Sequence, residues 1–200
     1  MTRFIDQLSL IKIRLSGVSI KNNLVKTSYL HKDLSFIYDK NEYVIRNVYE
    51  VFVKQTYKRL KVKNMKVIDI GASVGDSSIY FIMNGAKEVY AYETDSKRYE
   101  YMQKNLIKNN VGNIKTINSH FTDFDNINDE YVLKIDCEGC EYEFFNPSNF
   151  NKIKKLDQII IEYHNGNGGL IKNLSTMGYN LSVEPINDRL GMIYAKRGTA

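Results

Sequence analysis

From residue 66 onward, short apolar stretches alternate with longer amphipathic stretches, and this alternation constrains the fold more than any other feature. The apolar stretches predict strands at 66–70, 88–92, 114–118, 131–136, 157–163, 179–185 and 190–196. The amphipathic stretches predict helices near 76–84, 96–109, 141–154 and 167–177. Such an order favours an α/β fold, with right-handed crossovers and a mostly parallel sheet that carries helices on both faces.

Two intervals refine this prediction. Asn187 and Asp188 allow a hairpin between the last two strands, so one strand should run antiparallel to the others. The interval between 118 and 131 is too short for a crossover helix with its loops. That side of the sheet should therefore be thinly covered.

The first 65 residues form an N-terminal lead-in that packs on the main domain, residues 66–200. We expect a short helix, a small hairpin over 24–38, and an amphipathic helix over 41–60 that is capped by Asn41. No repeat or Pro/Gly-rich linker separates the two parts.

Composition and charge narrow the class of protein. Hydrophobic residues make up 43% of the chain, yet no apolar run approaches the roughly 20 residues of a membrane span, and the N-terminus lacks a signal-peptide centre. We therefore expect a soluble, cytoplasmic protein. Residues 1–66 hold 14 Lys and Arg against 5 Asp and Glu, which indicates either a surface for an anionic partner such as nucleic acid or simply solvated lysines.

The segment "VIDIGASVGDSS", residues 67–78, predicts a strand, a glycine turn and the start of a helix. Gly71 lies at the turn and Gly75 at the helix start, where a backbone without Cβ atoms can approach a ligand closely. The spacing differs from the G-x-G-x-x-G of dinucleotide sites, so a dehydrogenase fits poorly. Asp69 and Asp76 suit the ammonium group of an amino-acid-bearing cofactor better than a pyrophosphate.

Glu93 ends the next predicted strand, 18 residues after Gly75. An acid at this place reaches the ribose hydroxyls of a bound nucleotide. Asp95 is predicted instead to cap the helix that begins at Ser96.

The segments "VIDIGASVGDSSIYF", "VYAYET", "LKIDCEGCEYEFF" and "IIIEYH" resemble the FkbM family of S-adenosylmethionine (SAM)-dependent methyltransferases. The resemblance spans about residues 43–164. It implies a Rossmann-like sheet of seven strands, bound SAM, and methyl transfer that usually goes to a hydroxyl oxygen. It also implies an adenine pocket after the third strand, near Thr122 and Asp123. The candidate cofactor residues are therefore Asp69, Gly71, Ala72, Gly75, Asp76, Glu93, Thr122 and Asp123.

Methyl transfer to an alcohol requires in-line alignment and a proton acceptor. Lys134 and Asp136 lie two residues apart on the fourth strand of the main domain, and Glu138 follows in the turn. His164, at the end of the fifth strand, is an alternative base. These four residues are the catalytic candidates. A hard cation held by Asp136, Glu138 and Glu162 suits the oxygen ligands, but the spacing does not require it, so no metal is predicted.

Other functions remain open. The Asp136 region also resembles part of the Lys-Asp-Lys-Glu set of ribose 2′-O-methyltransferases, and the basic lead-in suits RNA, although that reading is not favoured. A SAM-binding module without turnover is a third possibility.

Cys137 and Cys140 lack the further ligands of a zinc site and are expected to be small buried residues. The favoured function is SAM-dependent O-methylation of a sugar or small metabolite.

Overall fold

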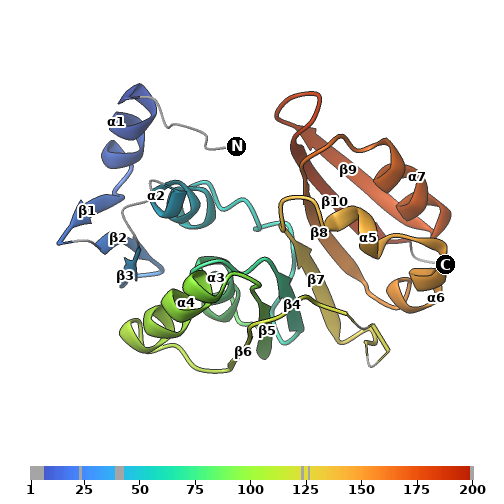
Figure 1. Cartoon of the computed structure of the whole chain (residues 1–200), viewed down its shortest axis with the longest axis horizontal. Helices are drawn as coiled ribbons and strands as arrows, with labels where there is room; N and C mark the ends of the chain where they lie inside the picture. The colour runs from blue at the N-terminus through green and yellow to red at the C-terminus, as the bar shows by residue number, and fades with distance from the viewer. Residues whose placement is uncertain (1–6, 23, 39–42, 123, 126, 199–200) are drawn as a thin grey trace.

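The computed structural model describes residues 7–22, 24–38, 43–122, 124, 125 and 127–198. Its main feature is a seven-stranded sheet with the order β6-β5-β4-β7-β8-β10-β9 (Figure 1). The strands in that order are β6 (Ile114–Ile117), β5 (Glu88–Tyr92), β4 (Lys66–Ile70), β7 (Tyr131–Ile135), β8 (Gln158–Tyr163), β10 (Gly191–Arg197) and β9 (Tyr179–Pro185).

The sheet is parallel from β6 to β8, and β10 runs antiparallel to both of its neighbours. The prediction of a mostly parallel sheet with one antiparallel strand is confirmed. In the centre, Ile70 of β4 lies beside Tyr92 of β5 and Ile135 of β7. The carboxyl ends of these three strands therefore meet at one edge, where open α/β sheets bind ligands.

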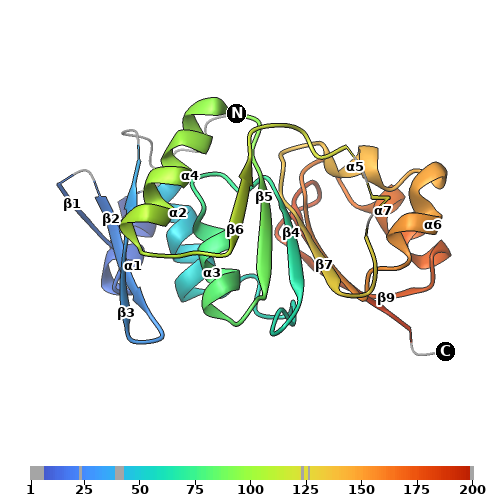
Figure 2. The same ribbon diagram turned by 90° about the horizontal axis from the view of Figure 1, so that it is seen from below.

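Helices cover both faces of the sheet (Figure 2). One face carries α3 (Asp76–Met83) and α4 (Ser96–Lys108), and the other carries α5 (Glu141–Phe144), α6 (Phe150–Ile153) and α7 (Gly168–Thr176). Each face has its own buried apolar cluster, because side chains alternate between the two sides of a strand. Val67 belongs to one cluster and Ile68 to the other.

The predicted helix over 141–154 is wrong as a single element. It is broken into α5, a 3-10 turn η2 (Pro147–Asn149) and α6. Asn146 adopts an extended conformation and accepts a hydrogen bond from the Ser148 amide, while Pro147 supplies no amide to continue the first helix. Between β6 and β7 the described residues form no helix, as predicted, and Phe121, Phe124 and Ile127 cover the sheet there.

The N-terminal third forms its own layer. It contains α1 (Gln7–Leu15), a sheet of β1 (Ser19–Lys21), β2 (Leu24–Tyr29) and β3 (Lys32–Ile37), and α2 (Tyr43–Val48), which continues as a π-helical turn, η1 (Tyr49–Val53). The helix predicted over 41–60 ends early because the amide and hydroxyl of Thr56 both bind the Glu50 carbonyl. Its predicted cap, Asn41, lies outside the described residues.

Two buried asparagines, Asn105 in α4 and Asn109 at its C-cap, attach this layer to the main domain. Asn105 accepts from the Ile37 amide at 2.7 Å and donates to the Val74 carbonyl at 3.0 Å. Asn109 pairs with both backbone groups of Ser35 at 2.9 Å each. The free edge of β3 is thereby hydrogen-bonded to a helix. Among the described residues, no helix has the length and apolar character needed to cross a bilayer.

Candidate active site

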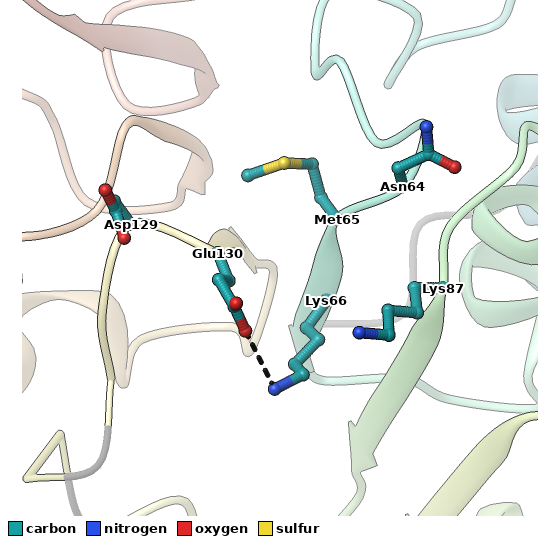
Figure 3. A pocket seen from close by; sticks show the side chains of 6 residues that line it. All are labelled: Asn64, Met65, Lys66, Lys87, Asp129 and Glu130. Atoms are coloured by element: carbon teal, nitrogen blue, oxygen red, sulfur yellow. Dashed lines mark hydrogen bonds and ion pairs between the residues drawn. The ribbon is translucent and has the colours of Figure 1, made fainter.

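A hollow lies at the carboxyl edge of β4, β7 and β8, beneath the N-terminal layer. The layer contributes one side of it through α2, η1 and the turns that follow. Its lining residues are Asn47, Glu50, Val51, Thr56, Tyr57, Gly71, Ser73, Asp76, Ser77, Lys134, Asp136 and Glu162. A second hollow opens at the opposite ends of the strands, around Lys66 and the Glu130 that pairs with it (Figure 3). Of the predicted residues, four line the first hollow, which is therefore the candidate site: Gly71, Asp76, Lys134 and Asp136.

The glycine loop at this edge is held by the strands around it. Gly71 has φ +76°, and a Cβ atom there would lie 1.8 Å from the backbone oxygen of Asp136. Gly71 is therefore required because the loop backbone passes close to the residue that follows β7. The sequence analysis attributed this requirement to the close approach of a ligand instead. The amides of Gly71 and Ala72 donate to the Tyr92 carbonyl, and Gly75, at φ +87°, is the N-cap residue of α3.

Asp69 and Lys134 form a buried ion pair under this loop. Their side chains are 0% and 1% exposed, and Lys134 Nζ lies 3.0 Å from Asp69 Oδ1. The other carboxylate oxygen of Asp69 accepts from the hydroxyls of Ser77 and Ser78, both at 2.6 Å. Lys134 also donates to the Gly71 carbonyl at 2.8 Å. Burial alone would lower the pKa of Lys134, but Asp69 and Asp136 outweigh it and raise the pKa above its ordinary value.

Glu93 is buried at the end of β5 and closes the loop from the other side. One carboxylate oxygen accepts from the Ser73 amide at 2.8 Å, and the other accepts from the Asp95 amide at 2.9 Å. Each carboxylate oxygen can accept a second hydrogen bond, so both remain able to receive a ribose hydroxyl. Asp95 caps α4 as predicted, accepting from the amides of Lys97 and Arg98.

Asp76 is the first residue of α3 and is only 4% exposed. Its Oδ1 has no hydrogen-bond partner among the described residues, although it lines the hollow. Burial raises the pKa of Asp76 to about 7, against the opposing effect of Lys134. A buried carboxylate oxygen without a partner is costly, so this place favours a cationic ligand group.

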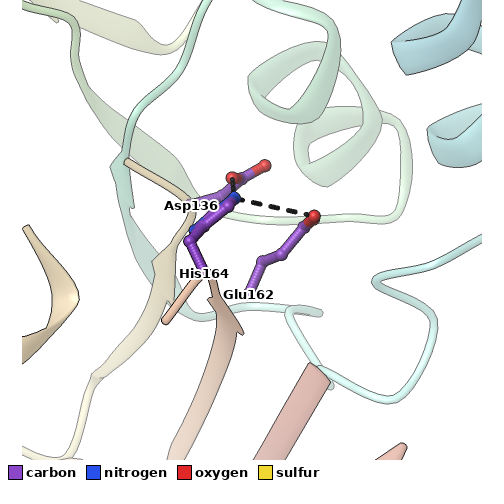
Figure 4. A group of neighbouring side chains, drawn as sticks. All are labelled: Asp136, Glu162 and His164. Atoms are coloured by element: carbon purple, nitrogen blue, oxygen red, sulfur yellow. Dashed lines mark ion pairs between the residues drawn. The ribbon is translucent and has the colours of Figure 1, made fainter. Parts of the chain in front are cut away.

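Asp136, Glu162 and His164 form a cluster at the ends of β7 and β8 (Figure 4). His164 Nε2 lies 3.7 Å from Asp136 Oδ1 and 3.8 Å from Glu162 Oε1, distances longer than hydrogen bonds. Burial, with the nearby charges of Asp136 and Glu50, raises the pKa of Glu162 to about 8. The sequence places Glu162 and His164 on the same side of their strand, and the structure brings Asp136 to them.

Two residues that complete the cluster were not among the predicted site residues. Glu141, fully buried at the start of α5, accepts from the His164 amide at 2.9 Å and lies 3.3 Å from His164 Nδ1. Tyr57 donates to Asp136 Oδ2 at 3.2 Å, and burial followed by the charge of Asp136 raises the pKa of its phenol well above the usual value. Glu141 was detectable as an acid at a helix start, but no sequence signal singles out Tyr57.

The remaining candidates lie away from the hollow. Glu138 is exposed in the turn after β7, and Thr122 is exposed in the segment before β7. Asp123 lies outside the described residues. Cys137 and Cys140 are half-buried and joined in a disulfide, so the expectation of two buried thiols is wrong. The tight turn brings their Cα atoms to 5.5 Å, within the range that a disulfide spans.

Comparison with known proteins finds a family model that matches part of this site. Residues 113–181 match the model of the Methyltransferase FkbM domain. Over these residues the chain is similar to the FkbM methyltransferase domain. The FkbM segment runs from β6 into β9 and contains Asp136, Glu162 and His164. The glycine loop and Glu93 precede it.

Two viral proteins are similar in sequence over about half of this chain. Uncharacterized protein 158B of Sulfolobus islandicus rod-shaped virus 1 is 29% identical over 108 residues, which is 54% of this chain and 66% of that protein. Uncharacterized protein 65 of a Sulfolobus islandicus filamentous virus is 30% identical over 112 residues, 54% of this chain and 65% of that protein. The matches thus span just under two thirds of these relatives.

Solved structures are similar in fold over a larger part of this chain than the FkbM segment. TrmK of M. capricolum, in complex with S-adenosyl-homocysteine (SAH), has a TM-score of 0.56 at 21% identity, over 73% of this chain and 68% of that one. The precorrin-6y C5,15-methyltransferase of Geobacter metallireducens has a TM-score of 0.54 at 16% identity, over 81% and 95%. The fold is therefore the Rossmann-like fold of SAM-dependent class I methyltransferases.

Proposed function

We propose that this protein is a SAM-dependent methyltransferase that transfers a methyl group to a hydroxyl of a sugar or small metabolite. The observation that carries the proposal is the junction of two sites at one edge of the sheet. The glycine loop, which Glu93 closes, lies beside the cluster of Asp136, Glu162 and His164, and residues of both line one hollow.

The cofactor would occupy the side of the hollow that the loop forms. Glu93 would accept hydrogen bonds from the ribose, and Asp76 would take the ammonium group, since its unpartnered oxygen favours a cation. Asp69 and Lys134 form an ion pair with each other beneath the loop, so we assign them the positioning of that loop. Bound SAM would supply an electrophilic methyl group. Several structures with this fold were solved with SAM or SAH, including the magnesium protoporphyrin IX methyltransferase of Synechocystis PCC 6803.

The acceptor would occupy the side of the hollow that the N-terminal layer forms. Its proton would pass to Asp136, which Tyr57 holds through a hydrogen bond, or to His164 as the alternative base. Carboxylates from Glu50, Asp136 and Glu162 surround this space. They can form hydrogen bonds with the hydroxyls of a neutral polyol. Lys134 is the one basic residue among the described lining and is already paired with Asp69, so the hollow offers little to a phosphate group, which argues against an RNA acceptor.

A methyl-transfer assay with radiolabelled SAM tests this proposal, using neutral sugars and polyols as acceptors beside RNA. With an acceptor in hand, Asp136→Asn should lower kcat by about 10² to 10⁴, the usual contribution of a general base, and leave SAH binding intact. His164→Gln distinguishes the two candidate bases: it should keep its activity if Asp136 is the base and lose it if His164 is the base. Full activity of Asp136→Asn would exclude Asp136, and SAH binding without methylation of any hydroxyl acceptor would favour a module without turnover.

A further inference from the structure

We infer that Asp136, Glu162 and His164 form a binding site for one divalent cation. One ligand atom from each of the three side chains lies within 4.8 Å of the others. Ligand atoms lie about 2 Å from a bound transition metal, so two ligands of one ion are about 3 to 4 Å apart. The distances from His164 Nε2 to the two carboxylates, 3.7 and 3.8 Å, fall in that range.

The orientation of His164 supports a ligand role. Glu141 lies 3.3 Å from Nδ1 and is fully buried, which favours a proton on Nδ1 and leaves the lone pair of Nε2 directed toward the two carboxylates. A carboxylate behind the distal nitrogen is the usual support of a metal-binding histidine. In Figure 4 the three side chains converge from β8 and the end of β7. Without a proton or a cation between them, three electron-rich groups face one another.

The charge of the hollow is an independent observation that points to a cation. Of the described residues that line it, only Lys134 is basic, and Asp69 already pairs with it. Glu50 is paired with Arg46 at 3.0 Å. Asp76 lines the same hollow and is buried, and its Oδ1 has no hydrogen-bond partner among the described residues. The ammonium group of SAM would satisfy Asp76 alone. The charge on Asp136 and Glu162 would then be balanced either by a proton on His164 or by a bound cation.

The sequence did not predict this site, because it offered Glu138 as the third ligand. Glu138 is exposed in the turn, and His164 takes its place. Two carboxylates and one imidazole suit Mn²⁺ better than a purely oxygen-binding ion. A bound cation would lower the pKa of a hydroxyl that coordinates it, which would aid the proposed methyl transfer. That benefit rests on the proposed function, whereas binding of the ion does not.

Calorimetric titration of the full chain with Mn²⁺, in the absence of SAM, tests the inference. We expect one saturable site, with affinity reduced at least tenfold by Asp136→Asn and by Glu162→Gln. Glu143→Gln is the matched control, because Glu143 is an exposed carboxylate on α5, close in sequence to Asp136. Its affinity for Mn²⁺ should equal that of the wild type.

Absence of saturable Mn²⁺ binding to the wild type would overturn the inference, as would an equal loss in Glu143→Gln. If Asp136→Asn fails to fold, Glu162→Gln decides alone. Parallel titration with SAH separates this result from the proposed function. If the protein binds SAH but not Mn²⁺, only the inferred cation site is contradicted. If it binds Mn²⁺ but not SAH, only the proposed cofactor site is contradicted.

Discussion

Asp76 couples the charge of the hollow to the stability of the fold. Its pKa is raised to about 7 in the folded protein, against about 3.9 for an unperturbed carboxyl. The folded state therefore binds more protons between these values, and stability should fall as the pH rises from about 4 to about 7. A cation bound beside Asp76 would offset this loss.

We expect Asp76→Asn to raise stability at pH 8 by up to roughly 4 kcal/mol, since a difference of one in pKa corresponds to about 1.4 kcal/mol. At pH 5 the gain should be much smaller, because most of the Asp76 carboxyls are then protonated in the folded protein. Urea unfolding of both proteins at the two pH values measures this. Equal gains at pH 5 and pH 8 would contradict the assignment of the raised pKa to Asp76.

At the scale of elements, α4 links the N-terminal layer to the glycine loop. Asn105 is fully buried and joins Ile37 of β3 to Val74 in that loop. A change in α4 should therefore affect both the attachment of the layer and the conformation of the loop.

Asn105→Ala should lower the free energy of unfolding by about 1 to 3 kcal/mol, because it leaves buried backbone groups of Ile37 and Val74 without partners. Gln103→Ala, in the same helix, is the control, since Gln103 carries an exposed side-chain amide. Chemical denaturation measures both variants. A loss below 0.5 kcal/mol for Asn105→Ala would indicate that water replaces these hydrogen bonds.

The elements also mark how far sequence can predict this structure. Strand periodicity located β4 and β5 to the residue, because buried parallel strands are short apolar runs with sharp ends. The break at Pro147 was missed because the amphipathic pattern continues through it. Tyr57 was missed for another reason: its contact with Asp136 joins positions 79 residues apart, and only the packing of the layer on the sheet brings them together.

At the scale of the whole molecule, the candidate site residues lie at the carboxyl edge of the sheet and not at its opposite edge. The carboxyl edge gathers the glycine loop, Glu93 and the acidic cluster, and the N-terminal layer lies over it with Glu50 and Tyr57. The N-terminal third is basic as a whole, but the side chains that it contributes to the site include Glu50 and no Lys or Arg among the described lining residues. Its lysines therefore need not contact the acceptor.

The most direct measurement is calorimetric titration of the full chain with SAH, SAM and NAD in parallel. We expect micromolar binding of SAH and SAM and no binding of NAD. Glu93→Ala should weaken the binding free energy of SAH by about 1 to 3 kcal/mol, the contribution expected from hydrogen bonds to a charged group. Binding of NAD in place of SAH and SAM, or no binding of any of the three, would contradict a SAM site at this edge of the sheet.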